Sequence, residues 1–264
     1  MTAIASARPT RPRPRIRSLG ITLVLVAFTV FAAREVSFSF STFWEVWSNP
    51  LWEKFWPIPW GWVLDGDNVI KPLVETFQIA VVSTVIGCGL ALPISFAMSP
   101  LTTPNRPTHL ISRAVMNVVR AVPDLFWAKL LVTAIGIGAF AGSWALSVFS
   151  LAVMVKLFSE TIDSADPGPL EAARAAGGRH TPVVRTGVLP TVLPAYVAYA
   201  LYVFELNIRA SVVLGLVGAG GIGRVLEAQR QFFKFDRILG ILVLIFVVVW
   251  IVDQISVALR KRLV

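Results

Sequence analysis

Charge is scarce in this chain. Only 15% of its 264 residues are Asp, Glu, Lys or Arg, whereas soluble domains carry about 25%. Hydrophobic residues make up 56% of the chain, and the mean hydropathy is +0.73. Because the apolar runs continue from one end to the other, the composition excludes an ordinary soluble domain and indicates one membrane domain.

The residues that form disulfides and hold metals are also scarce. Cys88 is the only cysteine, which excludes an internal disulfide, and its apolar surroundings in the sequence suit a packing role. The two histidines, His109 and His180, are far apart, so we expect no metal-ligand cluster. The pattern G-x-x-x-x-G-K-[ST] is missing, so we expect neither a cofactor nor ATP hydrolysis by this chain itself.

Long apolar runs fill most of the sequence. Six of them approach the ~20 residues that a bilayer requires: 18–34, 74–98, 114–137, 142–160, 191–215 and 238–259. The third run contains Arg120, Asp124 and Lys129, so its first turns are expected at the membrane surface. The predicted fold class is an all-α polytopic membrane protein with about six transmembrane helices.

The distribution of positive charge predicts the orientation in the membrane. The segment 1–17 carries five arginines and no acid, and the chain ends in Arg260-Lys261-Arg262. Both termini are therefore expected in the cytoplasm, together with the loops 100–113 and 161–190, while the acidic loop 35–73 is expected outside. The tail also resembles the start of a signal peptide, but no small-x-small cleavage site follows it.

Two features of the predicted outer side have more than one explanation. The loop 216–237 carries four cations against the orientation rule: Arg224, Arg230, Lys234 and Arg237. They suit contact with lipid headgroups, attraction of an anionic solute, or docking of an acidic binding protein. Six of the nine tryptophans lie in the loop 35–73, where they suit the headgroup layer or a docking platform for an extracytoplasmic partner.

A polar segment, EAARAAGGRHTPVVRTGVLP at 171–190, lies between two apolar runs. Pro167-Gly168-Pro169 can feed a helix, and Glu171 suits the positive end of that helix's dipole. Gly177-Gly178 breaks this helix, and Leu189-Pro190 opens the next one. Two short helices held outside the bilayer suit a contact through which another protein binds the chain and moves it. The alternative is an ordinary amphipathic loop.

The spacing of this segment resembles the EAA signature of ABC-importer permeases: Glu-Ala-Ala, three residues, Gly, nine residues, a hydrophobic residue, any residue, Leu-Pro. The positions in register are Glu171, Ala172, Ala173, Gly177, Leu189 and Pro190. Gly187 stands where the signature has a hydrophobic residue. The resemblance implies that these residues couple the chain to a separate ATPase. It makes 161–190 the coupling loop of a permease domain, 18–264, that follows a basic cytoplasmic tail, 1–17.

The fifth span is rich in polar side chains. Its polar series consists of Tyr196, Tyr199, Tyr202, Glu205, Asn207 and Arg209. On a helix these positions form a drifting stripe about 20 Å long at ~1.5 Å per residue, and Glu205 can pair with Arg209 at i,i+4. Ionisable groups at membrane depth normally face a bundle interior or a water-filled route. Two interpretations of these residues therefore remain: they line a translocation pathway, or Glu205 and Arg209 form a structural ion pair that satisfies itself.

A glycine-rich stretch, GAGGIG at 218–223, follows that span. Gly218, Gly220 and Gly223 match G-x-G-x-x-G, but a dinucleotide fold needs a soluble strand–helix–strand unit and an acid about twenty residues further on. These glycines, with Gly221, lie between two apolar spans instead. They indicate a tight turn or gate on the outer side, or a close approach of two helices.

The segment YVFELNIRASVVLGLVGAGGIG, starting at Tyr202, resembles the phosphonate-transport permease (PhnE) family. That family carries Tyr-x-x-Glu-x-Asn-Ile-Arg followed by Val-Gly-Ala-Gly-Gly-Ile-Gly. Arg120, Pro123 and Asp124 resemble its Arg-x-x-Pro-Asp/Glu element. The likeness covers about residues 70–260, and Ala139 replaces an expected proline.

The resemblance implies a type I ABC-importer permease in the bacterial inner (plasma) membrane that moves a phosphonate or phosphate-like anion inward by alternating access. The implied partners are a cytoplasmic ABC ATPase dimer, a second permease subunit, identical or not, an extracytoplasmic substrate-binding protein and membrane lipid, but no nucleic acid. A permease of the same class for phosphate itself, methionine or an organosulfonate is the alternative. A polytopic lipid-phosphate enzyme is an alternative of a different class. It would need acids clustered with arginine or histidine at one membrane face, and neither His109 nor His180 has such neighbours in the sequence.

Overall fold

The computed structural model describes residues 16–36 and 39–262, and these ranges contain helices but no strand. The all-α prediction is therefore confirmed for the described residues. The chain divides into two units, Met1–Trp52 and Glu53–Val264, and each is described by itself. The basic segment 1–15 lies outside the described residues.

The first unit holds α1 (Ile16–Glu35) and α2 (Phe40–Trp47). Helix α1 covers the first predicted span, and its residues from Leu19 to Phe31 are not buried by the rest of the first unit. A helix with such a run of apolar side chains needs apolar surroundings. In α2 the rings of Phe40, Phe43 and Trp44 are exposed as well, which suits the interface between lipid and water.

The second unit contains the remaining helices. In chain order they are η1 (Pro50–Phe55, which begins in the first unit), α3 (Trp60–Val63), η2 (Gly66–Ile70), α4 (Lys71–Met98), α5 (Arg106–Ala121), α6 (Asp124–Ile135), α7 (Ala139–Asp163), α8 (Gly168–Ala175), α9 (His180–Gly187), α10 (Leu189–Gly215), α11 (Gly221–Gln231) and α12 (Phe235–Arg260). Among the described residues, four helical stretches are long and apolar enough to cross a membrane: Gly66–Met98, α7, α10 and α12. They match the second, fourth, fifth and sixth predicted spans.

The third predicted span, 114–137, is wrong as one continuous helix. The segment is divided between α5, of 16 residues, and α6, of 12 residues. Pro123 causes the break, because a proline disfavours helical geometry in the residue before it. Val122 is accordingly extended, with φ −87° and ψ 125°. Each of the two helices is shorter than the ~20 residues of a full span.

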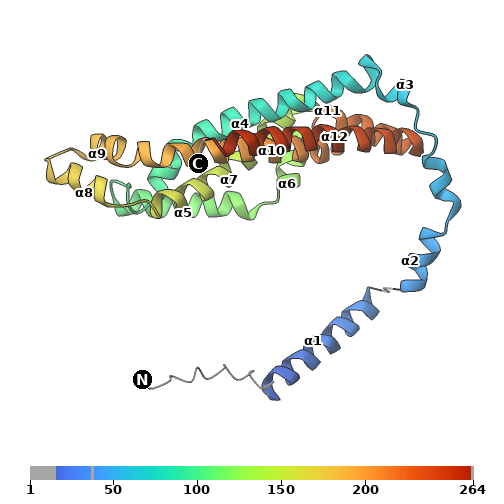
Figure 1. Ribbon diagram of the computed structural model, residues 1–264, viewed down its shortest axis with the longest axis horizontal. Helices are drawn as coiled ribbons and strands as arrows, with labels where there is room; N and C mark the ends of the chain where they lie inside the picture. Colours follow the sequence, from blue (N-terminus) through green and yellow to red (C-terminus); the bar gives the residue numbers. More distant parts are fainter. Residues whose placement is uncertain (1–15, 37–38, 263–264) are drawn as a thin grey trace, which may run out of the picture. The chain divides into compact units, whose positions relative to one another are not determined.

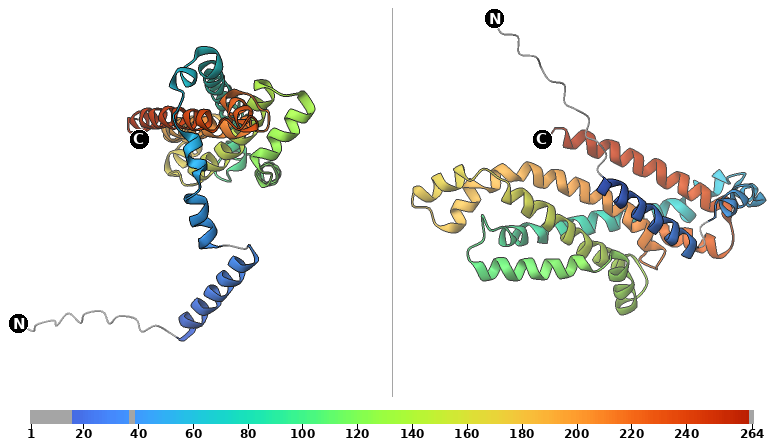
Figure 2. Two further views of the ribbon diagram at one scale, coloured as in Figure 1. Left: turned by 90° about the vertical axis from the view of Figure 1, so that its right-hand side faces the viewer. Right: turned by 90° about the horizontal axis from the view of Figure 1, so that it is seen from below.

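The core of the second unit forms where α4 packs along α7 and α10 packs against both. Figures 1 and 2 show α4, α7, α10 and α12 running along the unit, with α8 and α9 at one end and α3 and α11 at the other. Small residues allow the close approach of α4 and α7: a Cβ on Gly87 would lie 2.4 Å from the Cβ of Ser150.

A buried amide holds these three helices together. Asn207 of α10 is fully buried, and its Nδ2 donates to Thr84 Oγ1 of α4 at 2.8 Å and to Ser150 Oγ of α7 at 2.7 Å. Hydrogen bonds between membrane helices contribute about 0.6 kcal/mol on average and up to about 1.7 kcal/mol. The network therefore fixes the relative rotation of α4, α7 and α10.

We expect Asn207→Leu to destabilise the second unit by about 1–3 kcal/mol, because two interhelical hydrogen bonds are lost together. The measurement is the thermal unfolding midpoint of the purified complex in detergent. Gln254→Leu is the matched control, since Gln254 is exposed and its hydrogen bond is a 3.5 Å contact with the adjacent Asp253. Equal midpoints for the two variants would contradict the structural role of Asn207.

Candidate functional site

The segment with the EAA spacing folds as two short helices. Helix α8 carries Glu171 in its first turn, α9 follows, and Gly177 between them has a φ of +80°, which favours glycine. Helix α10 then begins at Leu189, with Pro190 in its first turn, where a missing N–H costs no helical hydrogen bond. The predicted helix, glycine break and second helix are therefore all present.

One side of this helical hairpin is anchored and the other is free. Leu170, Val183 and Val188 are buried against Phe158 and Ile162 of α7. By contrast, the EAA segment presents Glu171, Ala172 and Arg174 on its exposed side, while Ala173 is half-buried. The hairpin is thus fixed to a transmembrane helix by apolar contacts and leaves an acid and a cation exposed on its other side.

Close packing within the hairpin explains the glycine that departs from the signature. A Cβ on Gly187 would lie 3.0 Å from the carbonyl oxygen of Pro169 and 3.2 Å from Cα of Leu170. Helix α8 therefore passes so near the end of α9 that a larger side chain at position 187 would push the two helices apart. Glycine at this position is a consequence of this chain's own packing.

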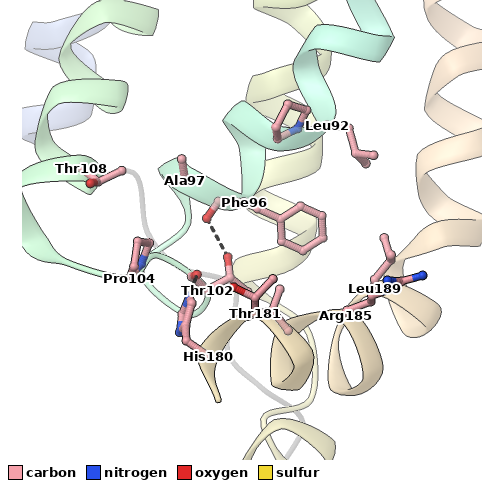
Figure 3. A pocket seen from close by; sticks show the side chains of 12 residues that line it. Leu92, Phe96, Ala97, Thr102, Pro104, Thr108, His180, Thr181, Arg185 and Leu189 are labelled. Carbon is pink, nitrogen blue, oxygen red and sulfur yellow. Dashed lines mark hydrogen bonds between the residues drawn. The ribbon is translucent and has the colours of Figure 1, made fainter. Parts of the chain in front are cut away.

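A cavity of about 520 Å³ lies beside α9, at the end of α4 (Figure 3). Its walls come from α4 and the loop after it, the start of α5, α9 and the start of α10: Leu92, Pro93, Phe96, Ala97, Thr102, Pro104, Thr108, His180, Thr181, Val184, Arg185 and Leu189. The Nε2–H of His180 donates to the Thr102 carbonyl at 2.8 Å, and Thr102 Oγ1 donates to the Phe96 carbonyl at 2.8 Å. These two bonds connect α9 to α4.

The polar residues of α10 lie on two faces of the helix rather than in one stripe. Tyr196 donates its hydroxyl to the Cys88 carbonyl at 2.6 Å, and the Tyr199 hydroxyl accepts from Thr161 Oγ1 at 3.0 Å. With Asn207 these tyrosines face α4 and α7. Successive residues rotate by about 100° around a helix, which places Tyr202, Glu205 and Arg209 together on a second face. The single drifting stripe predicted from the sequence is wrong.

Glu205 is the centre of a three-residue ion cluster. The predicted i,i+4 ion pair between Glu205 and Arg209 is confirmed. Glu205 is only 4% exposed, and its second oxygen, Oε2, accepts from Arg260 Nη2 of α12 at 3.3 Å. A buried carboxylate is costly unless it is paired, and here two guanidinium groups leave the cluster with a net positive charge.

Arg260 was not among the predicted site residues, because a cation near the end of the chain is explained by orientation in the membrane alone. The contact joins residues 55 positions apart on different helices, and no local spacing rule predicts such a pair.

The glycine-rich stretch forms a tight turn between α10 and α11. Three of its residues have positive φ: Gly218 (94°), Gly220 (85°) and Gly221 (68°). The turn is fixed on α4, because the Ile222 N–H donates to Thr76 Oγ1 at 2.8 Å. A Cβ on Gly223 would lie 2.0 Å from the Val212 carbonyl oxygen. The stretch therefore combines a turn that needs glycine with a close contact between α10 and α11.

Three of the four cations in the loop 216–237 have partners within the chain. Arg230 pairs with Glu227 at 2.6 Å, and this guanidinium lowers the pKa of the Glu227 carboxyl to about 2. The other two contacts are Arg224 with Glu75, at 4.0 Å, and Arg237 over the Trp62 ring, 4.5 Å from its centroid. Pairing reduces the positive field that the sequence suggests for this loop.

The bundle of membrane-length helices and the hairpin with the EAA spacing are the features expected of a transporter subunit. Residues 89–264 match the family model described as binding-protein-dependent transport system inner membrane component, and the chain belongs to this family of ABC-importer permeases. It is 37% identical over 199 residues to the phosphate-import permease protein PhnE of Mycolicibacterium smegmatis, covering 75% of this chain and 37% of that protein's length.

Other relatives and solved structures agree with this family. The chain is 37% identical over 193 residues to the phosphite transport system permease protein PtxC of Stutzerimonas stutzeri, covering 73% of this chain and 70% of that protein. An inward-facing structure of the MetNI methionine ABC transporter matches with a TM-score of 0.65 at 22% identity, covering 74% of this chain and 95% of the matched chain. The structural match shows the type I permease fold.

Family membership confirms several predictions. The chain is a multi-pass inner-membrane protein and a transporter subunit, and membership of this binding-protein-dependent family implies an ATPase and a substrate-binding protein as partners. ATP hydrolysis is the work of the partner subunit.

Proposed function

We propose that this chain imports a phosphorus oxyanion, that is, a phosphonate, phosphite or phosphate. The observation that carries the proposal is a difference in sequence identity between two groups of relatives. Relatives named for phosphate, phosphite or phosphonate transport are 34–41% identical to the chain, whereas a probable D-methionine permease of Vibrio cholerae is 25% identical. In the complete transporter two permease subunits pair on two ATPase subunits, and the binding protein delivers the anion from outside.

In this proposal the α8–α9 hairpin transmits the closing movement of the ATPase subunits to the transmembrane helices. Glu171, Ala172 and Arg174 are exposed and offer the contact surface. The apolar anchor on α7 and the link from His180 through Thr102 carry the displacement to α7 and α4. The residues assigned to coupling are Glu171, Ala172, Ala173, Gly177, Leu189 and Pro190.

The translocation pathway follows the second face of α10. Tyr202 and Arg209 are partly exposed along this face, and Glu205 fixes the Arg209 guanidinium. The opposite face of α10 holds the helix in place through polar groups that bind α4 and α7. Its residues are Tyr196, Tyr199 and Asn207. The glycine turn, which includes Gly218, Gly220, Gly221 and Gly223, acts as the outer gate where α10 meets α11.

The experiment that tests the function is uptake by the complete transporter reconstituted in proteoliposomes. Methylphosphonate, phosphite and phosphate are each supplied with the binding protein, and methionine serves as the comparison. We expect ATP-dependent uptake of at least one phosphorus oxyanion and none of methionine. Uptake of methionine alone would reject the proposed solute class.

Cysteine labelling tests the proposed orientation, with both termini in the cytoplasm. Gly66→Cys and Lys261→Cys are each made in a Cys88→Ala background. Position 66 has open space for a side chain and position 261 is exposed, so both thiols are accessible to reagent. A membrane-impermeant maleimide on intact cells is expected to label position 66 only, and disrupted cells provide the control. Labelling of position 261 on intact cells would reject the orientation.

A further inference from the structure

The first turn of α11 is capped by a side chain of another helix. The N-cap residue of α11 is Gly220, which has no side chain that could accept a hydrogen bond. The hydroxyl of Thr76 in α4 takes this role, because its Oγ1 accepts from the Ile222 N–H at 2.8 Å and donates to the Pro72 carbonyl at 3.0 Å. Thr76 and Ile222 are both fully buried, so water cannot replace the hydroxyl as the partner of this N–H.

The neighbouring residue of α4 brings a charge to the same place. A Cβ on Gly220 would lie 2.9 Å from Glu75 Oε1, so the carboxylate rests against the glycine turn. An acid beside a helix N-terminus is favoured by the helix dipole. Arg224 of α11 lies 4.0 Å from Glu75 Oε2, but both side chains are partly exposed, and such an ion pair contributes little. The buried hydroxyl of Thr76 is therefore the main polar link between α4 and the turn.

The glycine turn packs on α4 and α7 without a gap. A Cβ on Gly221 would lie 2.6 Å from Thr76 Oγ1. On the side of α7, a Cβ on Gly142 would lie 2.2 Å from the Ala219 carbonyl oxygen. Closely packed parts of a protein move as units rather than deform continuously. The turn can therefore leave α4 only if the contact with Thr76 breaks as a whole.

We propose that Thr76 is a positioning residue for the outer gate. Its hydroxyl holds the N-terminus of α11, and with it the glycine turn, on α4 through the whole transport cycle. The gate then opens by a movement that the turn shares with α4, and the turn does not separate from this helix. The assignment rests on the proposed gate role of the turn, and it does not depend on which solute is transported.

Loss of this hydroxyl is expected to loosen the gate. Thr76→Val keeps nearly the same shape but neither donates nor accepts, and the loss of one helix cap changes the equilibrium between the held and the released turn by about fivefold. A released turn closes the pathway incompletely, so leakage follows its population. We therefore expect methylphosphonate to leak about fivefold faster from loaded proteoliposomes than with the wild-type transporter, and less solute to be imported per ATP hydrolysed.

Two further variants separate positioning from folding. Thr76→Ser keeps the hydroxyl and is expected to restore the low leak and the wild-type ratio of solute to ATP. Thr133→Val removes a hydroxyl that donates to the Lys129 carbonyl within α6, at 2.8 Å, and is expected to behave like wild type. A purely structural role of Thr76 would lower the yield and the unfolding midpoint of the complex, but it would not change the leak or the ratio in the assembled transporter.

A disulfide across the junction tests whether the contact persists during transport. A Cβ on Gly221 would lie 3.5 Å from the Cβ of Thr76, at the short end of the ~3.5–4.5 Å range of disulfides. Thr76→Cys/Gly221→Cys is therefore made in a Cys88→Ala background. After oxidation we expect uptake close to that of the Cys88→Ala transporter, because the new bond replaces a contact that is kept through the cycle. After reduction we expect the leak seen in Thr76→Val.

Each outcome supports or overturns the assignment. An oxidised double variant that cannot transport, and that regains transport on reduction, would show that the turn leaves α4 and would overturn the proposal. Equal leak and an equal solute-to-ATP ratio in Thr76→Val and wild type would overturn it as well. The φ of Gly221, +68°, disfavours a side chain, so if the cysteine variant does not assemble, the comparison of Thr76→Val with Thr76→Ser decides. A wild-type transporter that imports methionine and no phosphorus oxyanion overturns the proposed solute instead, and the same variants are then compared with methionine.

Discussion

Replacing Glu171 with lysine is expected to abolish the stimulation of ATP hydrolysis by the solute-loaded binding protein, with a loss of at least tenfold. Glu171 lies exposed in the first turn of α8, where an acid is favoured by the helix dipole and a cation is not. The substitution also reverses the charge on the face that we assign to the ATPase. The measurement is ATP hydrolysis by the reconstituted complex with and without loaded binding protein.

The controls for this prediction separate coupling from folding. Glu171→Gln keeps the shape of the side chain and removes its charge, so we expect an intermediate loss. Glu53→Lys makes the same change of charge at an exposed acid of η1, which lies far from Glu171 in the sequence and on the proposed outer side of the membrane. This control variant is expected to keep the stimulation of ATP hydrolysis intact. Insertion into the membrane is expected to be normal for all three variants. Unchanged stimulation in Glu171→Lys would reject the coupling assignment.

The α8–α9 hairpin was predictable because local rules determine its two helices and the break between them. A first-turn acid, a glycine with positive φ and a Leu-Pro helix start each act within a few residues, and the structure has a helix, a break and a helix at those places. The break at Pro123 was just as local, since proline restricts the residue before it. Apolar length alone, however, favoured one continuous span.

The parts of the site that could not be predicted depend on contacts between distant helices. The rotation of α10 separates Asn207 from Arg209, and only the packing of α4 and α7 shows which face is buried. Residue types indicated polar chemistry in these segments, but the partner of each group is a property of the tertiary structure.

Removing the carboxylate of Glu205 is expected to be among the most damaging single changes in the chain. In Glu205→Ala the Arg209 and Arg260 guanidinium groups lose the acid that they share. Removing one partner of a fully buried ion pair costs about 3–5 kcal/mol, and the loss here is expected to be smaller because Arg209 and Arg260 are both partly exposed and stay partly solvated. We therefore expect poor assembly of this variant and a lowered thermal unfolding midpoint in detergent. Lys261→Ala, which removes an exposed cation beside Arg260, is the control and is expected to leave the midpoint unchanged.

The cluster has three members, so a double-mutant cycle on Glu205 and Arg209 alone does not isolate the pair. In Glu205→Ala/Arg209→Ala the Arg260 guanidinium remains without its acid, and we expect only partial recovery of stability. Adding Arg260→Ala is expected to restore more, because the triple variant contains no unpaired charge of the cluster.

Transport by the same variants distinguishes a structural cluster from a pathway. If Arg209 meets the solute anion, every variant with Arg209→Ala is inactive, even where adding Arg260→Ala restores the unfolding midpoint. If the three residues only stabilise the contact between α10 and α12, uptake recovers together with the midpoint. We expect the first result, because Arg209 is about half exposed while Glu205 is buried, which leaves part of its guanidinium available to an anion. Uptake near the wild-type rate by the triple variant would reject the pathway role of Arg209.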